Sequence, residues 1–269
     1  MTLNAPPLNH VRMGTGDPVL LLHSLGGTTV MWEPVMEALA AEREVIAVDM
    51  PGFGKSPPLL GDVRSSARNL AGAVLDFYDT LGIDAKPVVA GISLGGWVAI
   101  ESGRMGRASG VVGLCTAGFW ERPLGPKRSV ARVMAKLASP FLGAITSDPD
   151  RRRQALGSQI RHTERMTPEQ AAEIIRGYAR ASDYDDANAE MRGNVIGDLS
   201  DVKAPLTLAW AEHDTLVRRR PLSRVPPGTR QVVIPDAGHI PTWDQPEIAT
   251  ELILTGAMVE PSIPTGGQT

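Results

Sequence analysis

The segment that most constrains this chain is Gly91–Gly95, with the sequence Gly-Ile-Ser-Leu-Gly. It follows an apolar run at 87–90 and leads directly into a helix-like segment that starts at position 94. This order of strand, sharp turn and helix is typical of a nucleophile elbow, in which a strained serine is exposed and two glycines let strand and helix approach closely. The positive end of the helix favours negative charge that develops during reaction. The pattern predicts that Ser93 is a nucleophile; a structural turn serine is the alternative.

A serine nucleophile needs a base and an acid, and two later segments carry them. Asp214 follows the apolar run at 206–210, and His239 follows the run at 231–234. In an open parallel sheet the carboxyl ends of the strands share one edge, so both side chains are expected near Ser93. His239 is expected to remove the proton of Ser93, and Asp214 to orient the imidazole.

Two other carboxylates are alternatives for the acid. Asp236 lies three residues before His239 and is more typical of a turn residue before Gly238. Glu212 is more typical of a solvated loop residue. The sequence therefore favours Asp214 and leaves the other two as rivals.

Four separated segments of the chain resemble serine hydrolases of the α/β-hydrolase superfamily. They are Leu-His-Ser-Leu-Gly-Gly at 22–27, Asp-Met-Pro-Gly-Phe-Gly-Lys-Ser at 49–56, the elbow, and Gly-His at 238–239. The first is similar to the family's oxyanion loop, with Ser24 in place of the usual first glycine. The resemblance implies that the N–H groups of Leu25 and Leu94 stabilise an oxyanion. His23 is interpreted as a brace of this loop.

Alternating strand-like and helix-like segments predict an α/β fold with a mostly parallel, doubly wound sheet flanked by helices. Strands are expected at 18–23, 45–49, 87–92, 110–115, 205–210 and 231–234, with a short one near His10–Met13. Helices are expected at 30–42, 64–81, 94–106, 216–225 and 245–256.

The spacing of the strands breaks once, between Cys115 and Pro205. The intervening segment is too long for one crossover helix, so it predicts an inserted helical lid. Helical segments are expected inside it at 126–142, 148–162 and 167–181. The expected organisation is an α/β-hydrolase core at 1–118 and 200–258, a lid (cap) at 119–199, and a flexible tail at 259–269.

Five side chains are expected to contact the substrate: Ser24, Trp32, Trp120, Phe141 and Trp243. Trp32 shortly follows the oxyanion loop, and Trp243 shortly follows the predicted base. Trp120 and Phe141 lie in the lid, where inserted helices exclude water and shape a pocket. The alternative for the lid residues is packing against the core, because apolar residues at helical spacing are commonly buried.

Composition excludes some classes of function. A formal net charge of −3 and a pI of about 6.0 argue against a nucleic-acid partner. The single cysteine, Cys115, excludes an internal disulfide, and no apolar stretch approaches the ~20 residues of a membrane span. A cytoplasmic location is expected. No His, Cys and Asp residues have the spacing of metal ligands, so no metal and no other cofactor is expected.

Together these features predict a cofactor-free serine hydrolase that cleaves a small or medium, largely apolar carboxylic ester or lactone through an acyl-enzyme. By resemblance it is similar to lactonases such as 3-oxoadipate enol-lactonase and to small-molecule esterases. The alternatives are a carbon–carbon bond hydrolase of a ring-cleavage pathway, and a non-hydrolytic acyltransferase, lyase, cyclase or ligand receptor on the same fold. The expected partner is a small-molecule substrate, and a homodimer through apolar lid surface is left open.

Overall fold

The computed structural model describes residues 7–125, 127, 129–218, 225–256 and 258. Within these residues, one sheet has the strand order β1-β3-β2-β4-β5-β6-β7. Its strands are β1 (His10–Met13), β2 (Pro18–Leu22), β3 (Glu44–Val48), β4 (Val88–Ile92), β5 (Gly110–Leu114), β6 (Leu206–Ala211) and β7 (Arg230–Ile234). Only β1 pairs antiparallel, along β3. The predicted, mostly parallel sheet is confirmed.

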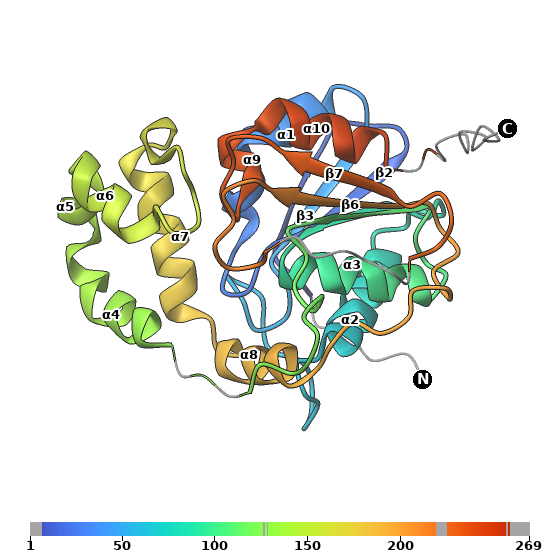
Figure 1. Ribbon diagram of the computed structural model, residues 1–269, viewed down its shortest axis with the longest axis horizontal. Coiled ribbons are helices and arrows are strands. Elements are labelled where there is room, and N and C mark those ends of the chain that lie inside the picture. Colours follow the sequence, from blue (N-terminus) through green and yellow to red (C-terminus); the bar gives the residue numbers. More distant parts are fainter. Residues whose placement is uncertain (1–6, 126, 128, 219–224, 257, 259–269) are drawn as a thin grey trace, which may run out of the picture.

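Helices cover both faces of the sheet (Figure 1). On one side lie α1 (Glu33–Ala40) and α10 (Pro246–Leu254), with the short η1 (Thr29–Trp32) and α9 (Pro241–Asp244); on the other lie α2 (Ala67–Asp79) and α3 (Leu94–Arg104). Alternate residues of a strand point to opposite faces. Val19 and Leu21 accordingly pack in the cluster with α1 and α10, whereas Leu20 and Leu22 pack in the cluster with α2 and α3.

The long segment between β5 and β6 forms a set of helices that stands beside the sheet (Figure 1). Its elements are α4 (Val130–Ala138), η2 (Ser139–Phe141), α5 (Leu142–Ser147), α6 (Pro149–Leu156), η3 (Thr163–Arg165), α7 (Pro168–Arg180) and α8 (Tyr184–Gly193). Thr167 and Gln170 cap the start of α7 reciprocally, so local sequence sets where that helix begins. The segment between β5 and β6 is thus largely helical, and its role as a lid stays a prediction.

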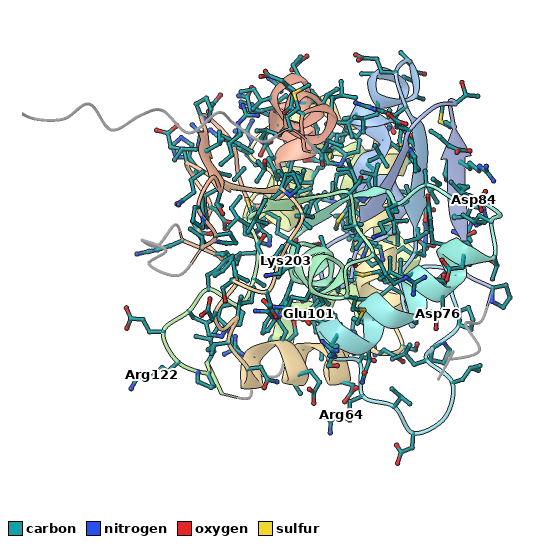
Figure 2. The ribbon with its side chains drawn as sticks, turned by 90° about the vertical axis from the view of Figure 1, so that its right-hand side faces the viewer. Arg64, Asp76, Asp84, Glu101, Arg122 and Lys203 are labelled. Carbon is teal, nitrogen blue, oxygen red and sulfur yellow. The ribbon has the colours of Figure 1, made fainter. Side chains whose placement is uncertain are left out.

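The last helix of the insertion is fastened to the core by an ion-pair group. Arg64, which Figure 2 shows beside α8, contacts Asp186 at 2.6 Å and Glu190 at 3.0 Å. The N–H of Ser65 also donates to Asp186 at 2.6 Å. These contacts hold α8 against the loop that precedes α2.

One expectation about secondary structure needs correction. The helix expected at 216–225 is wrong where it is described, because positions 216–218 and 225 are not helical; the others lie outside the described residues, as does the tail at 259–269. The backbone N–H groups at 216 and 217 instead bind the Asp214 carboxylate. Helices α8 and α9 were not predicted from the sequence. None of the helices in the described part combines the length and apolar character that a membrane span requires.

Candidate active site

Ser93 lies on a strained turn between β4 and α3. Its φ of 56° and ψ of −112° place a non-glycine residue in a left-handed backbone region. The flanking glycines are required by close packing: a Cβ at Gly91 would lie 2.1 Å from the carbonyl oxygen of Gly95, and one at Gly95 would lie 2.2 Å from that of Leu22. Strand, turn and helix therefore have the arrangement that the pentapeptide predicted.

His239 and Asp214 form a buried hydrogen-bonded pair. Nδ1 of His239 lies 2.7 Å from Oδ2 of Asp214, and both side chains are almost fully buried. The other carboxylate oxygen accepts the N–H groups of Leu216 at 2.8 Å and Val217 at 2.9 Å. Burial opposes ionisation of Asp214, but the hydrogen bond and charge of His239, with these two N–H groups, lower the pKa of Asp214 below its ordinary value. The acid therefore stays charged and holds one imidazole orientation.

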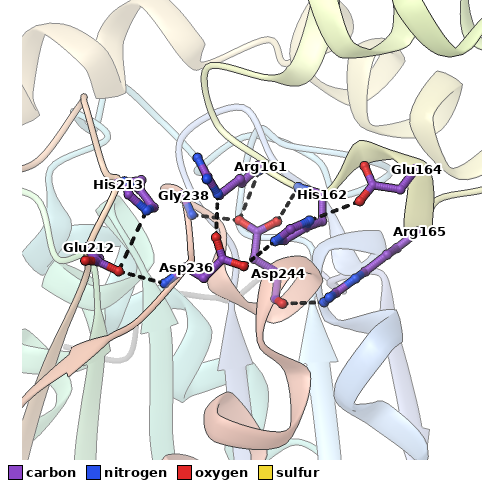
Figure 3. Close-up of polar contacts among 9 residues, drawn as sticks. All are labelled: Arg161, His162, Glu164, Arg165, Glu212, His213, Asp236, Gly238 and Asp244. Atoms are coloured by element: carbon purple, nitrogen blue, oxygen red, sulfur yellow. Dashed lines mark hydrogen bonds and ion pairs between the residues drawn. The ribbon is translucent and has the colours of Figure 1, made fainter.

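The rival acids face other groups. Asp236 is solvent-accessible and binds Arg161 at 2.5 Å and His162 at 2.9 Å, which lower the pKa of Asp236 (Figure 3). Its φ of 49° is that of a turn residue. Glu212 accepts the N–H of Asp236 at 3.0 Å. In the part of the chain that the structure describes, the carboxylate hydrogen-bonded to His239 is that of Asp214, so the geometry favours Asp214.

His23 braces the loop that follows β2. Its Nδ1 donates to the carbonyl oxygen of Ser24 at 2.8 Å, and its Nε2 accepts the N–H of Met50 at 2.9 Å. Complete burial lowers the pKa of His23, against the opposing charge of Asp49. A neutral imidazole with one donor and one acceptor satisfies both backbone groups. This supports the structural interpretation of His23.

A cavity of about 340 Å³ is lined by the proposed nucleophile and the proposed base. Its wall includes Ser93, His239 and Leu25, together with Ser24 and Trp120. The volume lies at the lower end of the range of small-molecule sites. The proposed nucleophile, the proposed base and the proposed oxyanion loop thus line one cavity.

Of the five side chains expected to contact substrate, two lie in this wall: Ser24 and Trp120. The other three are corrected. Trp32 and Trp243 are buried in the hydrophobic cluster between the sheet, α1 and α10, because each follows the active-site edge on a short helix that turns back toward the core. Phe141 is 66% exposed on η2. Helical periodicity alone did not distinguish these orientations.

Cys115 lies close to the proposed acid and base. Ligand atoms of Cys115, Asp214 and His239 lie within 4.8 Å of one another. Burial is the main cause that raises the pKa of the Cys115 thiol well above its ordinary value, and the charge of Asp214 adds to it. A protonated thiol is a poor metal ligand and nucleophile, since the thiolate is the reactive form.

Sequence reasoning missed Asp244, a fully buried carboxylate at the end of α9. Figure 3 shows its surroundings: the carboxylate accepts the N–H groups of Gly238 at 2.7 Å, His162 at 2.8 Å and Arg161 at 3.1 Å. The guanidinium of Arg165 donates to its backbone oxygen. In the sequence Asp244 resembles an ordinary residue of the turn before α10, so no local signal identified it.

Comparisons with known proteins agree with this architecture. The Alpha/beta hydrolase family matches residues 19–251. The chain is 29% identical over 267 residues to a pimeloyl-[acyl-carrier protein] methyl ester esterase of Aeromonas hydrophila subsp. hydrophila, covering 90% of this chain and 96% of that protein. It is 29% identical over 246 residues to the dihydrolipoyllysine-residue acetyltransferase component of the acetoin cleaving system of Pseudomonas putida, covering 89% of this chain but only 63% of that protein.

A solved structure of a thermophilic esterase from Thermogutta terrifontis is 26% identical, with a TM-score of 0.67, and the match covers 94% of this chain and 95% of that one. Family match, sheet topology and elbow geometry point the same way. The chain therefore belongs to the alpha/beta hydrolase family of enzymes, as its motifs predicted.

Proposed function

We propose that this protein is a serine hydrolase that cleaves a small or medium, largely apolar carboxylic ester or lactone, with Ser93 as nucleophile, His239 as base and Asp214 as acid. The observation that carries the proposal is the buried 2.7 Å contact between His239 and Asp214, with His239 and Ser93 in the wall of one cavity. An esterase among the relatives that match nearly full length supports the choice of ester chemistry.

The proposed reaction proceeds through an acyl-enzyme. The oxygen of Ser93 attacks the ester carbonyl carbon, and its proton passes to Nε2 of His239, the ring nitrogen that does not face Asp214. The oxyanion accepts the N–H groups of Leu25 and Leu94. Collapse breaks the bond to the alkoxide, which takes the proton from His239. Water, deprotonated by the same imidazole, then releases the acid and restores Ser93.

Two features near Ser93 and His239 stabilise the charges that form in the proposed reaction steps. The first turn of α3 begins directly after Ser93, so its free N–H groups point toward the developing negative charge. Asp214 keeps its charge behind His239 and stabilises the imidazolium formed in each step.

The test is a panel of p-nitrophenyl esters and lactones combined with a fluorophosphonate label. Wild-type protein should turn over members of the panel and carry the adduct on Ser93, and Ser93→Ala should lose both. Ser200→Ala, which removes an exposed serine hydroxyl, is the matched control. An adduct on Ser24 or Ser56 would contradict the assignment of the nucleophile. Labelling of Ser93 without turnover of any ester or lactone would favour a receptor or a non-hydrolytic enzyme.

A further inference from the structure

A second cavity, of about 320 Å³, lies between the helices of the lid and the segment after β2 that carries Leu25, Gly26 and Met31. Residues from α4, α5, α6 and α7 contribute to its wall, among them Ala135, Leu142, Leu156 and Ile174. We call this space the lid chamber. Nothing in the proposed mechanism uses it.

The lid chamber adjoins the catalytic cavity. Five residues line both spaces: Leu25, Ala131, Ser158, Gln159 and Tyr178. Leu25 is the residue that carries a proposed oxyanion donor, so one side of the shared boundary lies beside the reacting carbonyl. A chain attached to that carbonyl would therefore reach the lid chamber across this shared boundary, beside Leu25.

The two spaces differ in polarity. Among the described residues, the wall of the lid chamber contains no charged side chain, and its polar members are the shared Ser158, Gln159 and Tyr178. The hydroxyl of Tyr178 is already engaged by Ser129 at 2.5 Å. The catalytic cavity, in contrast, also carries Lys127 and Arg192.

This difference selects the part of a substrate that enters the lid chamber. Water needs two to four polar partners to be held in a cavity, and this wall offers few. An alkyl chain, in contrast, is stabilised by each CH₂ group that it buries against such a wall. A charged or strongly hydrated group would lose its water shell without a partner.

We propose that the lid chamber binds the unbranched acyl chain of the substrate, so that the substrate class is an ester of a medium-chain fatty acid. This inference rests on the proposed function. The carbonyl lies at Ser93, the chain passes Leu25 and the shared boundary, and its end packs against Ala135 and Ile174 on facing sides of the lid. The alcohol portion stays in the more polar catalytic cavity.

The experiment compares p-nitrophenyl acetate with the octanoate. Wild-type kcat/KM should be at least about tenfold higher for the octanoate, since a single methylene in an apolar pocket is worth about tenfold or more. Ala135→Phe, which fills the lid chamber, should remove that advantage and leave acetate within about twofold. Val133→Phe is the matched control, because Val133 lies on the exposed side of the same helix. Equal activity on both esters, or equal loss on both in Ala135→Phe, would overturn the proposal.

A second variant and a binding readout keep the test decisive. If Ala135→Phe does not fold, Ile174→Ala enlarges the lid chamber and should move the preferred chain length upward; an unchanged preference would refute the proposal. Octanamide, but not acetamide, should raise the Tm of Ser93→Ala, and Ala135→Phe or Ile174→Ala should reduce this shift. This readout needs no turnover, so failure of the proposed function leaves it intact. If kcat/KM rises with the length of the alcohol, in hexyl and octyl acetate, and not with the length of the acyl chain, the assignment of the lid chamber to the acyl chain is wrong.

Discussion

The carboxylate of Asp244 accepts a 2.7 Å hydrogen bond from the N–H of Gly238, the residue that directly precedes His239. The same carboxylate accepts two N–H groups from the lid, those of Arg161 and His162. Ile240, on the other side of His239, donates its N–H to Gln159 at 3.0 Å. The loop that carries the proposed base is therefore bound to the lid segment that lines both cavities.

Asp244→Asn should destabilise the protein and slow the reaction. An amide replaces one acceptor oxygen of the carboxylate by an NH₂ group that only donates, so at least one N–H loses its partner. Hydrogen bonds to charged groups contribute about 1.5–3 kcal/mol each. We expect the free energy of unfolding to fall by about 2 kcal/mol and kcat by about tenfold or more, because small misplacement of a catalytic group is costly. Urea unfolding and steady-state kinetics measure both. Asp62→Asn, at an exposed position, is the control. An equally small effect of both variants would contradict the role of Asp244 in positioning the loop that carries His239.

Asp214→Asn should lower kcat by about 10³–10⁴-fold, because an amide favours the wrong imidazole tautomer. Asp236→Asn should lower it much less, since the Asp236 carboxylate faces Arg161 and His162. Both variants are to be measured at one pH and at matched thermal stability. The opposite ranking would transfer the role of acid to Asp236.

The contact between His162 and Asp236 should make lid attachment depend on pH. Hydrogen bonds to Asp236 and then Glu164 raise the pKa of His162 in the folded state, whereas burial and the charge of Arg165 oppose them. Because the pKa of His162 is higher in the folded protein than in the unfolded chain, protonation of His162 stabilises the folded state. The stabilisation is complete below the ordinary histidine value of about 6.5 and is lost as pH rises through the folded pKa.

The difference in Tm between wild type and His162→Gln should therefore be larger at about pH 6 than at about pH 9. Comparing the two proteins at each pH removes the contribution of groups that titrate equally in both. A difference that does not change between the two pH values would show that the protonated imidazole adds nothing to the lid attachment.

Dialysis against EDTA should leave kcat/KM unchanged. The cluster of Cys115, Asp214 and His239 has ligand atoms close together, but Nδ1 of His239 is engaged by Asp214 at 2.7 Å and burial keeps the thiol protonated. Metal binding would have to break that hydrogen bond and remove the thiol proton. A loss of activity that added Zn²⁺ reverses would contradict this expectation.

Local sequence patterns predicted much of the architecture. The strands β2 to β7 lie in apolar runs, and Gly91 is required by the carbonyl oxygen of Gly95, four residues away. Gly95 is instead required by the carbonyl oxygen of Leu22, a contact between distant parts of the chain. The capping box of Thr167 and Gln170 is also a local signal, and it is observed. The apolar runs, the requirement for Gly91 and the capping box depend on neighbours in the chain, which a sequence displays directly.

Local patterns did not predict every feature correctly. They failed for the helix expected at 216–225 and for the orientations of Trp32, Phe141 and Trp243. A tryptophan a few residues after Leu25 or His239 can face either the cavity or the core. The packing of whole helices against the sheet decides which of the two it faces. Exposure of Phe141 depends in the same way on how η2 joins α4 and α5.

The sequence by itself determined the alternation of strands and helices, the strained turn at Ser93 and the order in the chain of the proposed nucleophile, acid and base. Only the tertiary structure decided which carboxylate meets His239, because Asp214, Asp236 and Asp244 are chemically alike and differ in what the sheet edge and the lid place opposite them. The lid chamber likewise exists only once four helices enclose it. Burial and partner choice are properties of three-dimensional packing between distant segments, and no local pattern encodes them.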